Sequence, residues 1–136
     1  MPQVIVLDSH VWFWWINLEH HRLSPSMRDE IATAPRVGVS SVSCFELALA
    51  HQRGRLELPL PTREWLSLAL TGSDIELLPL TPAISARAVE LSHIHRDPFD
   101  RIIIATTLEM DARLASVDGH FPNYTELTGR LITRRE

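Results

Sequence analysis

The sequence predicts a single α/β domain over residues 1–136, with helices on both faces of a central, mainly parallel sheet of four or five strands. Short β-branched runs alternate with longer segments of helical pattern, which is typical of consecutive β-α-β units. A length of 136 residues fits one domain of common size. The chain is 45% apolar and 22% charged, a balance that excludes a disordered chain.

The strands are expected at short apolar runs. Residues Val4–Leu7 form a continuous run, as a strand buried on both faces requires. The other candidates, in chain order, are Arg36–Ser40, Ile75–Leu80, Arg113–Val117 and Arg130–Thr133. Pro79 marks either the end of the third run or an edge strand, because proline lacks the N–H that a strand donates. The fifth run has the weakest pattern.

Capping residues mark the expected helix starts. Ser24, Thr81 and Asp97 each precede a proline, the arrangement of an N-cap followed by the first helical residue. Ser43 and Glu46 have the spacing of a capping box, which predicts a helix start at Ser43. Residues 54–61 are predicted to connect this helix to a short one that contains Trp65.

The composition limits the class of protein. Thirteen arginines against seventeen acidic residues give a net charge of -4, which argues against constitutive nucleic-acid binding. The single Cys44 excludes an intramolecular disulfide framework and is typical of a reducing compartment. The sequence contains no apolar run near the roughly 20 residues of a membrane span and no signal-peptide pattern. A cytoplasmic protein without membrane contact is therefore expected.

Four acidic residues are expected to converge on one edge of the sheet. Asp8 and Asp118 follow the first and fourth strands, while Glu46 and Asp100 lie at the starts of helices. Carboxylates about 4 Å apart repel by roughly 4 kcal/mol at an effective dielectric constant near 20. A hard divalent cation such as Mg²⁺ relieves this repulsion and prefers oxygen ligands. Without these four acids the net charge would be zero, so the acidity of the chain is that of a metal-dependent nuclease without its metal.

Each acid also has a purely structural interpretation. Glu46 completes the capping box, and Asp100 is a first-turn acid that the helix dipole favours. On this interpretation the protein is a catalytically silent α/β binding module. A phosphoacceptor receiver domain also gathers acids around Mg²⁺, but it needs a lysine after its last strand, and the sequence contains no lysine.

Four strings occur in order along nearly the whole chain: Leu7–Trp15, Val39–Ala48, His95–Ala105, and Ser116–Asp118 followed by Phe121. Together they resemble the PIN-domain family, and within it the VapC-type toxin ribonucleases of type II toxin–antitoxin systems. The resemblance implies a compact α/β/α fold, RNA cleavage with Mg²⁺ or Mn²⁺, and a cognate VapB-type antitoxin. It places the catalytic, metal-binding acids at Asp8, Glu46, Asp100 and Asp118.

Three residues depart from the family pattern. Ser9 and Ser116 stand where threonine is common, and both keep a hydroxyl beside the expected metal site. Cys44 stands where a large aromatic residue is frequent, so looser packing behind Glu46 is expected.

Basic residues flank the acids. His10, Arg96 and Arg101 are candidates for contact with substrate phosphates. The alternative for His10 is a role in fixing the turn, and for the arginines it is an exposed ion pair with a nearby acid.

Trp12, Trp14 and Trp15 crowd one segment of a chain that is only 7% aromatic. Aromatic side chains dominate protein cores and are also enriched at interfaces, so core packing and a partner-binding groove both remain open. We expect the antitoxin to dock an amphipathic helix at this segment and to place an arginine or lysine at the acids. A homodimer is also expected.

Overall fold

The computed structural model describes residues 3–93 and 96–133, which form five strands, six α-helices and three short 3₁₀ helices. The strands are β1 (Val4–Leu7), β2 (Arg36–Ser40), β3 (Ile75–Leu78), β4 (Arg113–Ala115) and β5 (Leu131–Ile132). The α-helices are α1 (Ser9–Ile16), α2 (Pro25–Thr33), α3 (Ser41–Gln52), α4 (Thr62–Thr71), α5 (Pro82–Glu90) and α6 (Pro98–Glu109). The 3₁₀ helices are η1 (His20–Arg22), η2 (Phe121–Asn123) and η3 (Thr125–Leu127).

The five strands form one parallel sheet in the order β3-β2-β1-β4-β5. β1 is the central strand and all four of its residues are buried, as its continuous apolar pattern predicts. Leu7 lies opposite Val39 of β2 and Ala115 of β4, so these three strands end at the same edge. The predicted α/β class and parallel sheet are confirmed.

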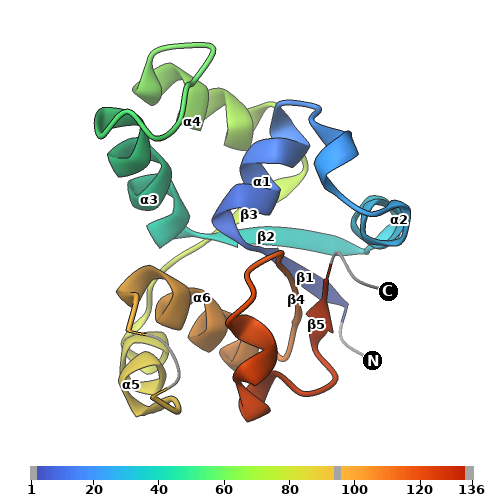
Figure 1. Cartoon of the computed structure of the whole chain (residues 1–136), viewed down its shortest axis with the longest axis vertical. Coiled ribbons are helices and arrows are strands. Elements are labelled where there is room, and N and C mark those ends of the chain that lie inside the picture. The colour runs from blue at the N-terminus through green and yellow to red at the C-terminus, as the bar shows by residue number, and fades with distance from the viewer. Residues whose placement is uncertain (1–2, 94–95, 134–136) are drawn as a thin grey trace.

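Helices cover both faces of the sheet (Figure 1). α1–α4 lie on one face, and α5, α6 and the η2–η3 segment lie on the other. Alternate residues of β1 enter the two cores: Ile5 and Leu7 join the core beneath α1–α4, whereas Val4 and Val6 join the core beneath α6. The molecule is therefore an α/β/α sandwich with the carboxyl ends of the strands between the two helical layers.

The predicted proline-containing helix starts are confirmed. Ser24 and Thr81 each accept a hydrogen bond from the backbone N–H three residues later, at 3.1 and 3.2 Å. Asp97 accepts from the backbone N–H groups of Phe99 and Asp100, at 2.9 and 3.3 Å. These caps satisfy helix N–H groups that would otherwise lack partners.

The predicted capping box is wrong. α3 begins at Ser41, and Ser40 is its N-cap, with its hydroxyl accepting from the Val42 N–H at 3.3 Å. Ser43 is buried inside the first turn of the helix, so Glu46 lies beyond the first turn and caps nothing. The capping role that was the alternative to a metal-binding role for Glu46 is therefore contradicted.

Three strands are shorter than predicted. β3 ends at Leu78, directly before the proline, and β4 ends at Ala115, two residues before the expected end. β5 covers only Leu131–Ile132 of the expected Arg130–Thr133. Cys44 packs against the core beneath α1–α4. None of the helices in the described ranges has the length and apolar character that a membrane crossing needs.

Candidate active site

Asp8 lies at the centre of the carboxyl edge of the sheet. It directly follows β1, and its carboxylate caps α1 by accepting the Ser9 N–H at 2.8 Å. Its own N–H donates to the carbonyl of Ala115 in β4 at 3.0 Å, which ties the residue to the neighbouring strand. The side chain is only 5% exposed, so its carboxylate is held in a nearly dry position.

Ser116 connects Asp8 to Asp118. Its buried hydroxyl donates to Oδ2 of Asp8 at 2.8 Å and accepts from the Asp118 N–H at 3.0 Å. Oδ1 of Asp118 in turn accepts from the His120 N–H at 2.7 Å. Asp118 therefore lies three residues beyond the end of β4, in a turn that a serine hydroxyl holds against the sheet.

Ser9 connects α1 to Glu46 of α3. The Ser9 hydroxyl lies 2.6 Å from Oε1 of Glu46 and 2.8 Å from the hydroxyl of Ser43. A hydroxyl carries one proton, so Ser9 donates to the carboxylate and accepts from Ser43. Sequence reasoning missed Ser43 as a site residue, because its partner is 34 positions away in the sequence.

Asp100 brings α6 to the same edge. It lies in the first turn of the helix and is 6% exposed. Burial is the main cause that raises its pKa to about 8, and the negative charges of Asp8, Asp97, Asp118 and Glu46 raise it further. Asp100 therefore lies within electrostatic reach of the other three predicted site acids.

Burial also raises the pKa values of Asp8 and Glu46. At Asp8, hydrogen bonds from Ser116 and Ser9 and the nearby His10 partly offset this rise in pKa. At Glu46, the Ser9 hydroxyl partly offsets it. The groups that partly offset burial at Asp8 and Glu46 are therefore serine hydroxyls, the Ser9 N–H and the His10 ring.

The donors at this edge are carboxylate and hydroxyl oxygens, which suit hard cations such as Mg²⁺ and Mn²⁺. As the described side chains stand, no three of the histidine, cysteine, aspartate and glutamate residues are arranged to hold a metal ion together. Chemically, the edge offers carboxylate and hydroxyl oxygens, and burial disfavours the ionised forms of Asp8, Glu46 and Asp100.

Comparison with protein families gives a match to the PIN domain over residues 5–127. The chain belongs to the PIN-domain family. This PIN domain is 36% identical, over 115 residues, to Ribonuclease VapC22 of Mycobacterium tuberculosis (strain ATCC 25618 / H37Rv). The matched region is 84% of this chain and 86% of that protein.

Two solved structures share the fold of this PIN domain. One is a chain of the crystal structure of VapBC2 from Rickettsia felis bound to a DNA fragment from their promoter, with a TM-score of 0.67 and 14% identity. That match covers 96% of this chain and 98% of the other. The second is a chain of a toxin–antitoxin complex from Klebsiella pneumoniae, with a TM-score of 0.60, 16% identity, and coverage of 97% and 98%. At these identities the likeness establishes the fold alone.

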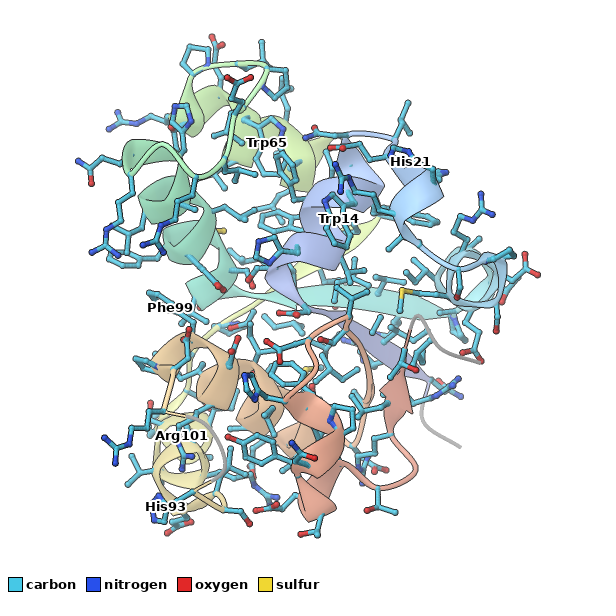
Figure 2. All side chains as sticks on the ribbon, viewed as in Figure 1. Trp14, His21, Trp65, His93, Phe99 and Arg101 are labelled. Atoms are coloured by element: carbon cyan, nitrogen blue, oxygen red, sulfur yellow. The ribbon has the colours of Figure 1, made fainter. Side chains whose placement is uncertain are left out.

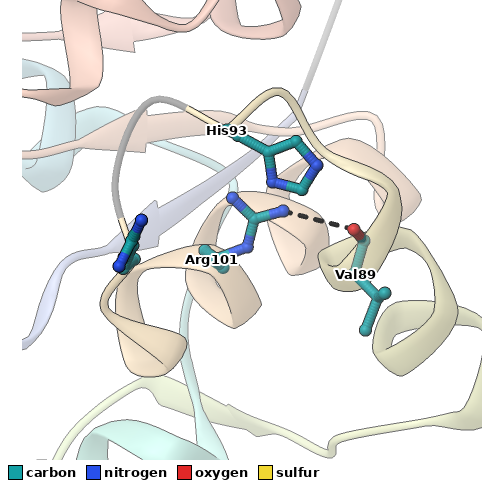
Figure 3. Close-up of a pocket in the computed structure, with 4 residues that line it drawn as sticks. Val89, His93 and Arg101 are labelled. Carbon is teal, nitrogen blue, oxygen red and sulfur yellow. Dashed lines mark hydrogen bonds between the residues drawn. The ribbon is translucent and has the colours of Figure 1, made fainter.

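The basic residues predicted to flank the acids lie in different surroundings. His10 is exposed at the start of α1, with its ring centroid 5.9 Å from that of Trp14. Arg96 is exposed and, with Val89, His93 and Arg101, lines a hollow of about 470 Å³ beside α5 (Figure 3). His95, the first residue of the third string, lies outside the described residues.

Arg101 has a structural role that the sequence did not predict. Its guanidinium group donates to four backbone carbonyls at the end of α5, those of Ala88, Val89, Leu91 and Ser92, at 2.9–3.3 Å. Figure 3 shows the contact with Val89. These carbonyls belong to the last turn of a helix and the residues after it, so Arg101 caps the end of α5.

Trp12, Trp14 and Trp15 differ in how far their side chains are buried. Trp12 is fully buried, with its ring 5.5 Å from that of Trp65, so its predicted place on a docking surface is wrong. Trp14 is half-buried, and the guanidinium carbon of Arg22 lies 5.6 Å from the centre of its ring. Trp15 is half-buried and lines a hollow of about 340 Å³ between α2 and the starts of β2 and β3. Figure 2 labels Trp14 and Trp65 on this side of the molecule.

Proposed function

We propose that this PIN domain is the ribonuclease toxin of a toxin–antitoxin pair and hydrolyses RNA phosphodiester bonds with Mg²⁺ or Mn²⁺. Asp8, Glu46, Asp100 and Asp118 would hold the metal. The observation that carries the proposal is the buried position of Asp100, whose pKa rises to about 8 beside the other three acids. The identity to a protein named as a ribonuclease supports the choice of RNA as substrate.

Different residues of the chain have different roles in the proposed hydrolysis. Serine hydroxyls orient two of the carboxylates, since Ser116 donates to Asp8 and Ser9 donates to Glu46. One of the four carboxylates accepts a proton from the attacking water, and the products are a 3′-hydroxyl and a 5′-phosphate. A bound metal ion at such a site lowers the pKa of water and stabilises charge on the phosphodiester. His10, which is exposed beside Asp8, is placed to contact a substrate phosphate.

Cleavage of a labelled single-stranded RNA by the purified protein tests this proposal. We expect cleavage with Mn²⁺ and none with EDTA. The rate for Asp100→Asn should be at least about a hundredfold lower than for the wild type. The control is Asp29→Asn, which removes an exposed carboxylate from α2. Equal rates for wild type and Asp100→Asn would contradict the metal site. No cleavage by wild type under any metal condition would favour the silent binding module.

We also propose that a VapB-type antitoxin docks at the Trp14–Trp15 side of α1. The hollow beside Trp15 is lined mainly by apolar side chains, including Ile31, Val37 and Ile75, and suits the apolar face of a helix. A cationic side chain of the antitoxin would then neutralise the acids. We expect Trp15→Ala to weaken antitoxin binding at least about tenfold, since aromatic residues dominate binding energies. Equal binding after this change, measured by titration calorimetry, would contradict the docking site.

A further inference from the structure

An aromatic pair borders the acidic edge on the α3–α6 side. Phe45 directly precedes Glu46, and Phe99 directly precedes Asp100. Their ring centroids lie 5.6 Å apart with an interplanar angle of 44°. Figure 2 labels Phe99 where the start of α6 faces α3. Because each phenylalanine neighbours a site acid in the sequence, the pair lies at a fixed place beside the carboxylates.

Phe45 is exposed although it is aromatic. It is 61% exposed, and among the described residues it is the one aromatic side chain in the group of large apolar residues that remain exposed. An isolated exposed leucine needs no explanation, but an exposed aromatic ring beside an active site offers a stacking surface.

A hollow continues from Phe45 along α3. It has a volume of about 450 Å³ and is lined by Phe45, Ala48, Leu49, His51, Gln52 and Thr62. Phe45, Ala48, Leu49 and Gln52 are spaced as one stripe of a helix, about 10 Å long. The floor is apolar, while Gln52 and Thr62 provide hydrogen-bonding groups at the far end. This combination fits a flat heteroaromatic ring with polar edges, as a nucleobase is.

Three arginines follow directly beyond the hollow. Arg53 and Arg55 lie after the end of α3, and Arg63 lies at the start of α4, all of them exposed. Five other arginines form ion pairs with carboxylates: Arg22, Arg36, Arg87, Arg113 and Arg130. In the part of the chain that the structure describes, Arg53, Arg55 and Arg63 form none. Guanidinium groups left without carboxylates are suited to phosphate oxygens.

From this arrangement we infer that the outer face of α3 binds the unpaired RNA strand on one side of the cleaved bond. We name this face the α3 track and define it by Phe45, Phe99, Gln52, Thr62, Arg53 and Arg63. The base next to the cleaved phosphate stacks on Phe45 and Phe99, and a following base enters the hollow. Arg53 and Arg63 contact the phosphates beyond it. The inference rests on the proposed ribonuclease function and adds the residues that bind the substrate.

The order of features along α3 favours RNA over a second copy of the chain. The face runs from carboxylates that repel phosphate, through an uncharged aromatic and apolar stretch, to arginines without carboxylate partners. About 10 Å separates the two ends, which is the length of about three stacked nucleotides. An RNA strand that leaves the acidic edge would meet each group in this order. A duplex would hide the faces of its bases from Phe45, so the track requires an unpaired strand.

Binding of a fluorescent ten-nucleotide single-stranded RNA in EDTA tests the stacking part. We expect Phe45→Ala to raise the Kd about tenfold and Phe45→Trp to restore it, because stacking on an aromatic ring adds affinity without sequence preference. The matched control is Val89→Ala, which trims another exposed apolar residue on α5. Phe45 is exposed, so these variants should fold, and melting temperatures equal to wild type check this.

The salt dependence of the same binding tests the arginine part. For single strands, the slope of log Kd against log salt changes by about 0.7 for each phosphate contact. We expect the double variant Arg53→Gln, Arg63→Gln to reduce the slope by about 1.4. The double control Arg36→Gln, Arg87→Gln removes equal charge from paired positions and should leave the slope unchanged.

The outcomes separate this inference from the proposed function. Unchanged affinity and slope in the track variants, with Mn²⁺-dependent cleavage intact in wild type, would overturn the track alone. Tight, Phe45-dependent RNA binding without cleavage would support the track and contradict the ribonuclease. A Phe45→Ala variant that turns a dimer into a monomer at unchanged RNA affinity would make this face an interface between copies. If Phe45→Ala weakened the binding of duplex RNA as much as that of single-stranded RNA, base stacking on Phe45 would be contradicted.

Discussion

Glu30 and Glu76 lie at the periphery of the molecule and are each held by an arginine, whereas Asp8 and Glu46, at the carboxyl edge of the sheet, are held by serine hydroxyls. Arg113 contacts both carboxylate oxygens of Glu30, at 2.8 and 2.9 Å, and Arg36 does the same for Glu76. The Arg36–Glu76 pair is exposed, and the Arg113–Glu30 pair is half-buried. The protein therefore places arginines beside acids that water would solvate well without them.

The pKa of Glu76 is shifted in the opposite direction to the pKa values of the buried acids. The Arg36 guanidinium lowers the pKa of Glu76, while burial raises the pKa of Asp8, Glu46 and Asp100. Burial of a carboxylate disfavours its charged form, and at Asp8 and Glu46 serine hydroxyls offset this only in part. This contrast supports our proposal that the inner acids bind a cation, and the following experiments test it.

The largest effect is expected for the pH dependence of stability without metal. The pKa of Asp100 is raised from 3.8 to about 8 on folding, so the folded state retains a proton that the unfolded state has lost. The free energy of unfolding is therefore not reduced by Asp100 below about pH 4. It falls by about 1 kcal/mol per pH unit as the pH rises from there to about 8, because folding then requires Asp100 to bind a proton. Thermal melts in EDTA between pH 4 and pH 8 measure this fall. Asp100→Asn should flatten it, and an equal slope in that variant would contradict the assignment.

Addition of Mn²⁺ at pH 8 should have the next largest effect. A ligand that binds only the folded state at ten times its Kd adds about 1.4 kcal/mol, which raises the Tm by about 4 °C. Differential scanning calorimetry with EDTA and with millimolar Mn²⁺ gives this shift. Asp100→Asn should lose most of it, whereas Asp29→Asn should keep it. Identical melting temperatures in the two solutions would contradict the metal site.

Removal of one serine hydroxyl should have a smaller effect. Ser9→Ala deletes the hydrogen bond to Oε1 of Glu46, so it should destabilise the protein by about 1 kcal/mol and raise the pKa of Glu46 further. Mn²⁺ affinity should consequently fall more at pH 6 than at pH 8, which calorimetric titration measures. The control is Ser85→Ala, whose hydroxyl donates only to a backbone carbonyl on α5. Equal losses in both variants would argue against a role for Ser9 in orienting Glu46.

The smallest effect is expected from the outer ion pairs. Arg36→Gln breaks an exposed pair, and solvent screening makes such pairs contribute little to stability. Its melting temperature, its Mn²⁺-induced shift and its RNA cleavage rate should match those of wild type. A large loss of cleavage in Arg36→Gln would contradict the contrast between outer and inner acids.

Much of the fold could be predicted because its signals are local. β1 and β2 have the predicted bounds, since each is a short β-branched run that hydrogen-bonds along its whole length. The caps at Ser24, Thr81 and Asp97 were predictable because the cap and its N–H partners are two or three residues apart. The acids could be placed at one edge because the ends of neighbouring parallel strands meet there.

The errors concern contacts between distant segments. The motif of Ser43 and Glu46 has the right spacing for a cap, but the hydroxyl of Ser43 bonds to Ser9 and the helix begins earlier. Trp12 differs from Trp15 only in its position around α1, and local sequence does not reveal which side faces Trp65. The Phe45–Phe99 pair joins residues 54 positions apart, so only the packing of α3 against α6 reveals it.

Arg101 links the position of the acidic edge to the far end of another helix. α5 ends at Glu90, before Leu91 and without a glycine, so its last carbonyls rely on this one guanidinium group from α6. A lysine has a single nitrogen and could not span the same carbonyls. Local unfolding of the last turn of α5 would release the first turn of α6, which carries Asp100. In the wild type, we expect slow amide hydrogen exchange in the last turn of α5 and a well-ordered Asp100 carboxylate. Arg101→Lys should make this exchange faster and the position of the Asp100 carboxylate less ordered.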